Sequence, residues 1–141
     1  MPESPPGRVL ALDLGQSRIG AAISDPDRRV AVPIGTIHTG APSDVKAIAA
    51  IVREQGVTEI VVGNPISLSG RRGEAADHAE KFAQALRDFL GIPVVLQDER
   101  FTTVQAERQL GQAGVRGQAR REVVDQAAAT IILQAYLDSL G

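Results

Sequence analysis

The chain has 141 residues, which is long enough for one domain with its own hydrophobic core and too short for two domains of ordinary size. It has no cysteine, so disulfides, zinc–thiolate sites and thiol nucleophiles are excluded. Aromatic residues make up 3% and the formal net charge is −2. These values argue against a nucleic-acid surface built on base stacking and, weakly, against a general nucleic-acid binder.

The first seven residues form a proline-rich segment without the apolar stretch of an export signal, and we expect residues 1–7 to be a flexible tail. No apolar run reaches the length needed to cross a membrane. We therefore expect a cytoplasmic protein, without membrane association, whose single folded domain covers residues 8–141.

The first half of the chain predicts three strands and a helix. Apolar and alternating runs predict strands at residues 8–14, 18–24 and 30–37, and their short connections predict an antiparallel meander. A helix follows from Ser43 or Asp44, either of which could cap it, to about residue 55, where Gly56 ends it.

The second half alternates strands with helices. We expect a buried strand at residues 59–63, a helix at 74–90, a strand at 94–99, a short helix from Thr102 to about residue 110, and a final helix at 123–140. Residues 111–117, rich in glycine, are expected to be flexible. This order predicts an α/β fold with a five-stranded mixed sheet, in which parallel strands extend three antiparallel ones and helices flank the sheet.

Asp13 interrupts the apolar run of residues 9–14, which reads as a strand covered on both faces. Burial of an ionised carboxylate in such a place costs several kcal/mol of hydration free energy. An arginine, backbone N–H groups or a metal ion can compensate this cost. The simpler interpretation is an aspartate that ends the strand and bonds to the following turn.

Two further acidic positions are oddly placed. Asp98 and Glu99 end an apolar strand and point to opposite faces, so only one of them can share a site with Asp13. In the last helix we expect Ala128, Ala129, Ile132 and Tyr136 to face the sheet, because their spacing places them on one side of the helix. Asp125 lies on the same side by this spacing. A solvated aspartate near the helix start is the alternative for Asp125. Converging carboxylates of this kind favour hard divalent cations, and a pair of such ions can cleave phosphodiesters.

The chain resembles the YqgF/RuvX family of the RNase H-like superfamily. The resemblance rests on four blocks that cover nearly the whole chain in order: residues 12–25, 61–65, 98–106 and 124–137. The Asp98-Glu99-Arg100 block with its paired threonines is highly specific, whereas the block around Asp13 also occurs in sugar kinases and Hsp70-like ATPases.

The resemblance implies a metal-dependent nuclease of ribosome biogenesis that processes the 5′ end of pre-16S rRNA. It implies Asp13, Glu99 and Asp125 as catalytic residues and metal ligands, with Mg²⁺ or Mn²⁺ as cofactor. Asp98 would then face away. The i+3 and i+4 positions after Asp125 are alanines, so a fourth carboxylate found in many superfamily nucleases is missing here.

Substrate contacts are expected from basic residues, because five arginines against two glutamates lie between residues 100 and 122. We name as candidate substrate-binding residues Arg18, Arg71, Arg100, Thr102, Arg116, Arg120 and Arg121. Arg18 could instead neutralise Asp25 or Asp98.

Three interpretations stay open at this point. The first is the nuclease acting on structured RNA, with a Holliday junction resolvase acting on branched DNA as its alternative. The second is a nucleotide-binding protein of the kinase or ATPase type, which needs two domains with the nucleotide between them. This chain has the length of one domain, and its sequence contains no Walker A loop. The third is a catalytically weak nucleic-acid-binding protein. The sequence distinguishes neither RNA from branched DNA nor a monomer from a homodimer.

Overall fold

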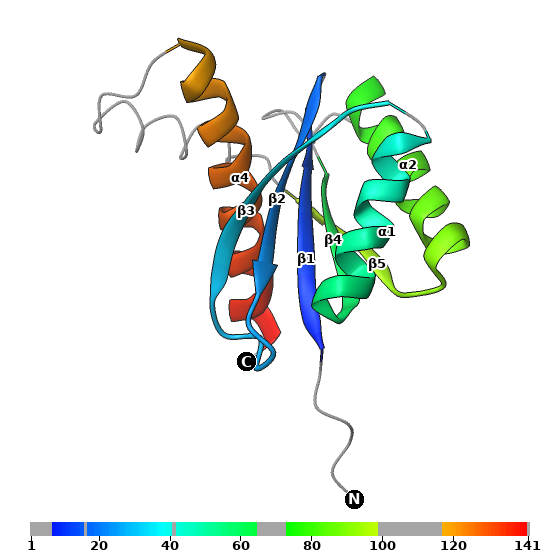
Figure 1. The fold of residues 1–141 in the computed structure, drawn as a ribbon, viewed down its shortest axis with the longest axis vertical. Helices are drawn as coiled ribbons and strands as arrows, with labels where there is room; N and C mark the ends of the chain where they lie inside the picture. Colours follow the sequence, from blue (N-terminus) through cyan, green and yellow to red (C-terminus); the bar gives the residue numbers. More distant parts are fainter. Residues whose placement is uncertain (1–6, 16, 41, 65–72, 99–116, 141) are drawn as a thin grey trace, which may run out of the picture.

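The computed structural model in Figure 1 describes residues 7–15, 17–40, 42–64, 73–98 and 117–140, apart from the side chains of Ala75 and of residues 117–126. Five strands form one sheet in the order β3-β2-β1-β4-β5. β1 (Arg8–Leu14), β2 (Arg18–Ser24) and β3 (Ala31–His38) are antiparallel neighbours. β4 (Val57–Asn64) and β5 (Val94–Asp98) continue the sheet in parallel on the other side of β1. The predicted mixed sheet is confirmed, with β1 at its centre.

The described helices cover both faces of the sheet. α1 (Ser43–Gln55) and α2 (Glu74–Leu90) lie on one face, and α4 (Gly117–Leu140) lies on the other (Figure 1). α4 begins at the end of the sheet where β1 and β4 finish, and it runs back toward the end where they start. None of the helices within the described residues combines the length and apolarity needed to cross a membrane.

The central strand is buried on both sides, as its apolar run predicts. Leu10 and Leu12 belong to the cluster under α1 and α2, whereas Val9 and Ala11 belong to the cluster under α4. All four are fully buried. Full burial of a valine or leucine side chain stabilises a fold by about 1.5–3 kcal/mol. β1 is therefore held firmly in place, and the direction of each side chain along it is fixed.

Helix ends follow glycine where the sequence predicts it. α1 and α2 end at Gly56 and Gly91, whose φ angles of 67° and 69° are left-handed. The predicted side-chain cap of α1 is wrong: Pro42 is the N-cap and makes no such bond. Ser43 and Asp44 instead bond Gly40, the former to its carbonyl at 2.9 Å and the latter from its N–H at 3.2 Å.

Four other elements differ from the prediction in their bounds. β3 is shifted by one residue, β4 is longer at both ends, and β5 stops at Asp98 rather than Glu99. α4 begins at Gly117, well before the predicted start near Val123. Residues 118–122 carry no apolar period, but most of them are strong helix formers, so the helix propagates through them. The short helix expected at 102–110 lies outside the described residues.

At the end of the sheet where β1 and β4 begin, polar side chains bond one another. Arg28 forms an ion pair with Glu59, its Nη1 lying 2.9 Å from Oε1, and also donates to Thr58 and to the carbonyl of Gly7. The Tyr136 hydroxyl of α4 donates to the other oxygen of Glu59 at 2.5 Å. Burial and this bond raise the pKa of Tyr136 to about 12. We call Arg28, Glu59 and Tyr136 the clamp, because they tie the β2–β3 turn, β4 and α4 together.

A second link at this end protects the edge of the sheet. The Gln134 side chain accepts a hydrogen bond from the Ala31 N–H at 3.1 Å and donates one to the Arg29 carbonyl at 3.0 Å. It therefore bonds the edge strand β3 as a further strand would. Pro33, two residues on, has no N–H to offer. Together these features shield part of this edge from pairing with another chain.

Candidate active site

The opposite end of the sheet contains the topological position at which open α/β sheets bind ligands. From β1 the chain turns to β2 on one side, and from β4 it passes through α2 to β5 on the other. In such sheets ligands bind beyond the carboxyl ends of parallel strands, where connections leave in opposite directions. Here those ends are Asp13 and Leu14 of β1 and Gly63 and Asn64 of β4.

Asp13 lies at this position with 8% of its surface exposed. Residues alternate faces along a strand, so it shares the α4 side with Val9 and Ala11, which pack in the α4 cluster. It pairs with Gly20 of β2. The register that joins Leu12 to Val62 brings Gly63 of β4 to its other side. A desolvated carboxylate therefore lies between two glycines, which add no side chain to this face of the sheet.

The pairing of β4 with β5 places Gln97 beside Gly63 and Asp98 beside Asn64. Val95 packs in the α4 cluster and Leu96 in the cluster under α1 and α2. By alternation Gln97 is on the α4 side with Asp13, and Asp98 is on the opposite side, where it is exposed. This agrees with the expectation that Asp98 does not share a face with Asp13. Glu99, the predicted partner, lies outside the described residues.

One complete row of residues crosses the α4 side of the sheet at this level. We call it the polar row, and it consists of Thr36, Gly20, Asp13, Gly63 and Gln97. The row that lies two residues further from the site on the same face is wholly apolar: Pro33, Ala22, Ala11, Val61 and Val95. The face under α4 therefore changes, within two residues along the strands, from an apolar row to a row that contains Thr36, Asp13 and Gln97.

α4 presents the expected residues to the sheet. Ala128, Ala129 and Ile132 are buried, and Tyr136 packs partly buried against the same cluster. Asp125 lies in the same helix, one turn before Ala129, and its side chain is outside the described part. Arg120 and Arg121 were expected beside a loop and instead belong to the first turns of α4, with side chains likewise not described.

Arg18 begins β2 next to the Asp13 turn, where its carbonyl accepts a hydrogen bond from the Gly15 N–H at 2.9 Å. The suggested pairing of Arg18 with Asp25 is wrong, because Asp25 follows the far end of β2. Its carboxylate accepts N–H bonds from Arg29 and Val30 at 2.7 and 3.0 Å, which lower the pKa of Asp25. Four other candidates for substrate contact lie outside the described residues: Arg71, Arg100, Thr102 and Arg116.

Among the described residues, no three His, Cys, Asp or Glu side chains come close enough together to hold a metal ion. The predicted ligand set has one described carboxylate, that of Asp13. Its burial and its acceptor-only chemistry fit a hard cation. Asn64 is a further unusual group, because its buried Oδ1 has no hydrogen-bond donor in the described part of the chain.

Sequence reasoning missed Gln97 and the two glycines as parts of this site. Gly20 and Gly63 carry a signal, since glycine weakens a strand and often marks a place of close approach. Gln97 carries none without the register of β4 and β5.

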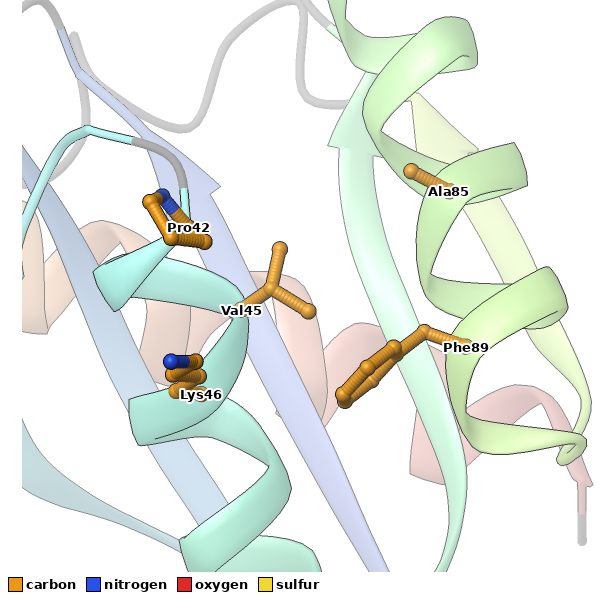
Figure 2. A pocket seen from close by; sticks show the side chains of 5 residues that line it. All are labelled: Pro42, Val45, Lys46, Ala85 and Phe89. Carbon is orange, nitrogen blue, oxygen red and sulfur yellow. The ribbon is translucent and has the colours of Figure 1, made fainter.

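A groove of about 260 Å³ between α1 and α2 is a separate feature (Figure 2). It is lined by Pro42, Val45, Lys46, Ala85 and Phe89. Its helices cover the face of the sheet opposite to the polar row. Lys46 is the one charged residue of this lining, and a single positive charge is too little to bind a polyanion, so the groove does not suit one.

Comparison with known proteins gives the same fold and a family. A poxvirus protein, the fowlpox resolvase solved with Holliday junction DNA, aligns with a TM-score of 0.60 at 12% identity, over 94% of this chain and 98% of that one. RuvC of Thermus thermophilus, also solved with a Holliday junction, aligns with a TM-score of 0.54 at 14% identity, over 95% and 96%. The expected RNase H-like fold is confirmed.

Several other proteins are much more similar to this chain in sequence than these two structures are. The chain is 51% identical to a Thermobifida fusca protein over 94% of this chain and 88% of the relative, and 46% identical to a Chloroflexus aurantiacus protein over 93% and 86%. Both carry the name "Putative pre-16S rRNA nuclease". The model of the RuvX family, described as Holliday junction resolvase, matches residues 7–139. The chain belongs to the RuvX family, as its sequence motifs indicate.

Proposed function

We propose that this chain is a metal-dependent nuclease that hydrolyses phosphodiester bonds in structured nucleic acid, with the 5′ end of pre-16S rRNA as its substrate in the cytoplasm. The observation that carries the proposal is the buried Asp13 carboxylate between Gly20 and Gly63, at the topological switch point. The names of its relatives support the choice of rRNA.

Asp13, Glu99 and Asp125 are the proposed catalytic residues and metal ligands. Two facts support this set: Asp13 lies on the side of the sheet that α4 covers, and Asp125 lies one turn before the buried Ala129 of α4. Three carboxylates and no nitrogen or sulfur ligand suit Mg²⁺ or Mn²⁺. The bound ions would supply Lewis-acid stabilisation of the negative charge on the phosphate. The protein's part is to hold the carboxylates rigidly, and β1 does this by its burial on both faces.

Phosphate contacts away from the reacting bond are assigned to the arginines. Arg18 lies at the β1–β2 turn, and Arg120 and Arg121 lie in the first turns of α4, all at the same end of the sheet as Asp13. Arg71, Arg100, Thr102 and Arg116 complete the proposed set. These groups would fix the register of the nucleic acid without reading its sequence.

A Holliday junction resolvase is the second candidate, favoured by the description of the family model and by the junction complexes among the solved structures of this fold. A resolvase must cut two strands symmetrically and so would act as a homodimer, whereas an rRNA nuclease can act as a monomer. The third candidate, a catalytically weak binding protein, would retain affinity for nucleic acid without cleaving it.

One set of assays separates these candidates. Hairpins that carry the 5′ boundary of 16S rRNA and four-way DNA junctions of equal length are incubated with the protein and Mg²⁺, Mn²⁺ or EDTA. We expect metal-dependent cleavage of the RNA. Paired symmetrical cuts in the junction alone would favour the resolvase, and binding without cleavage of either would favour the third candidate.

A further inference from the structure

Gln97 is the one described side chain besides Asp13 and Thr36 that projects from the polar row. The residue is partly buried, and its carboxamide has no hydrogen-bond partner among the described residues. Two other described glutamines are engaged: Gln84 bonds Asp88 and Arg87, and Gln134 bonds the edge of β3, whereas Gln55 is exposed to solvent. A carboxamide without a protein partner on the same face as Asp13 is available to bond a ligand.

The geometry of the row indicates where that ligand would lie. Asp13 and Gln97 are on the same face, one strand to each side of Gly63, so their Cα atoms are two strand spacings apart, roughly 9–10 Å. Gly63 places no side chain in the space between them. Glycine weakens a strand relative to alanine, so its place between Asp13 and Gln97 is consistent with a close approach of a ligand to the sheet.

We propose that Gln97 contacts the substrate: its Nε2–H donates a hydrogen bond to a non-bridging oxygen of the scissile phosphate, which binds between Gln97 and Asp13 on the α4 side of the sheet. This inference rests on the proposed nuclease site. A carboxylate at this position would repel the phosphate, and an aliphatic side chain would offer it nothing. A neutral carboxamide stabilises the phosphate without competing for the cations that the carboxylates hold.

The first test is kinetic. Gln97→Met keeps the size of the side chain and removes its donor, and Gln55→Met on the exposed end of α1 is the matched control. A lost hydrogen bond to a charged group is worth about 1.5–3 kcal/mol, which corresponds to a loss of roughly 10- to 100-fold in kcat. KM should change little. Gln97→Asn, which shortens the side chain by one methylene, should give a smaller loss. A Gln97→Met rate equal to that of Gln55→Met overturns the proposal.

The second test identifies the atom that Gln97 contacts. RNA is prepared with a single phosphorothioate of defined stereochemistry at the cleavage position, so that sulfur replaces one non-bridging oxygen. Sulfur is a weak acceptor, so the cost of Gln97→Met should shrink on one diastereomer and persist on the other. An equal cost on both diastereomers would make Gln97 a structural residue instead.

The third test does not depend on activity. Protein labelled with ¹⁵N-glutamine is titrated with an uncleavable RNA in the presence of Ca²⁺, and the side-chain amide signals of Gln97 are assigned by the Gln97→Asn variant. These signals should shift on binding while those of Gln55 stay in place. An unmoved Gln97 signal contradicts the contact. If Asp13→Asn also leaves cleavage intact, the proposed function itself fails. If Asp13→Asn abolishes cleavage but Gln97→Met does not reduce it, only this inference fails.

Discussion

The two ends of the sheet treat polar side chains in opposite ways. At the clamp end Arg28, Glu59 and Tyr136 satisfy one another through an ion pair and hydrogen bonds. At the site end Asp13 lies between glycines, the Gln97 carboxamide has no partner among the described residues, and the buried Oδ1 of Asn64 has no donor there. Buried polar groups that bond each other hold a fold together, whereas the side chains of Gln97 and Asn64, as far as the described residues go, have groups available to a ligand. Stability and chemistry are therefore expected to separate along β1 and β4.

Disrupting the clamp should have the largest effect on stability. Glu59→Ala removes the ion pair with Arg28 and the acceptor of Tyr136, and it leaves Arg28 partly buried without its partner. We expect a loss of about 2–4 kcal/mol in the free energy of unfolding, measured by urea denaturation. Glu54→Ala on the exposed side of α1 is the control. Cleavage by the folded Glu59→Ala fraction should stay near normal. A loss of activity at full stability would erase the distinction between the two ends.

Changing the proposed phosphate contacts should have the next largest effect, and it should act on binding alone. Replacing Arg116, Arg120 and Arg121 by alanine should reduce the slope of log affinity against log salt by up to about 2–3, near one unit for each lost contact. Binding should weaken about equally for all sequences, and kcat at saturating substrate should suffer less. The slope is measured by fluorescence anisotropy across a salt series. An unchanged slope would move the binding surface elsewhere, with Arg71 the next residue to test.

The smallest effect concerns the hydroxyl of Tyr136. Its pKa is raised to about 12 by burial and by the bond to Glu59. A raised pKa in the folded state stabilises the fold fully below the unfolded value near 10, and this contribution disappears as pH rises from about 10 to about 12. Tyr136→Phe should cost about 1–2 kcal/mol at neutral pH, and the difference from the natural chain should vanish across that range.

This shift can be measured directly, because Tyr136 is the sole tyrosine of the chain and there is no tryptophan. Absorbance of the phenolate near 295 nm should therefore rise with a midpoint near pH 12 in the folded protein. The unfolded chain in urea supplies the reference near pH 10. A midpoint near pH 10 in the folded state would show that the clamp bond does not form.

Much of the fold could be predicted from the sequence, because local patterns encode it. The bounds of α2 match the predicted residues 74–90, since an amphipathic run ends at Gly91, and β1 and β2 match because apolar runs flank a tight turn. The start of α4 could not be placed, since polar helix formers carry no hydrophobic period.

The clamp and the polar row could not be predicted, for a different reason. Arg28 and Glu59 are 31 residues apart, and Tyr136 is 77 residues from Glu59. Such pairs depend on the strand order and on the packing of α4. Gln97 gains its meaning only when the register of β5 brings it beside Gly63. Asp13, by contrast, could be singled out, because a carboxylate in an apolar strand conflicts with its surroundings.

The most direct test of the account is the Asp13→Asn variant, with Asp27→Asn in the exposed β2–β3 turn as the matched control. Cleavage of the pre-16S hairpin and thermal unfolding without metal are measured for both. We expect Asp13→Asn to abolish cleavage while its unfolding temperature stays equal or rises slightly, because the change relieves carboxylate repulsion. Asp27→Asn should leave cleavage unchanged. Full activity in pure Asp13→Asn protein would contradict the assignment of the chemistry to the polar row.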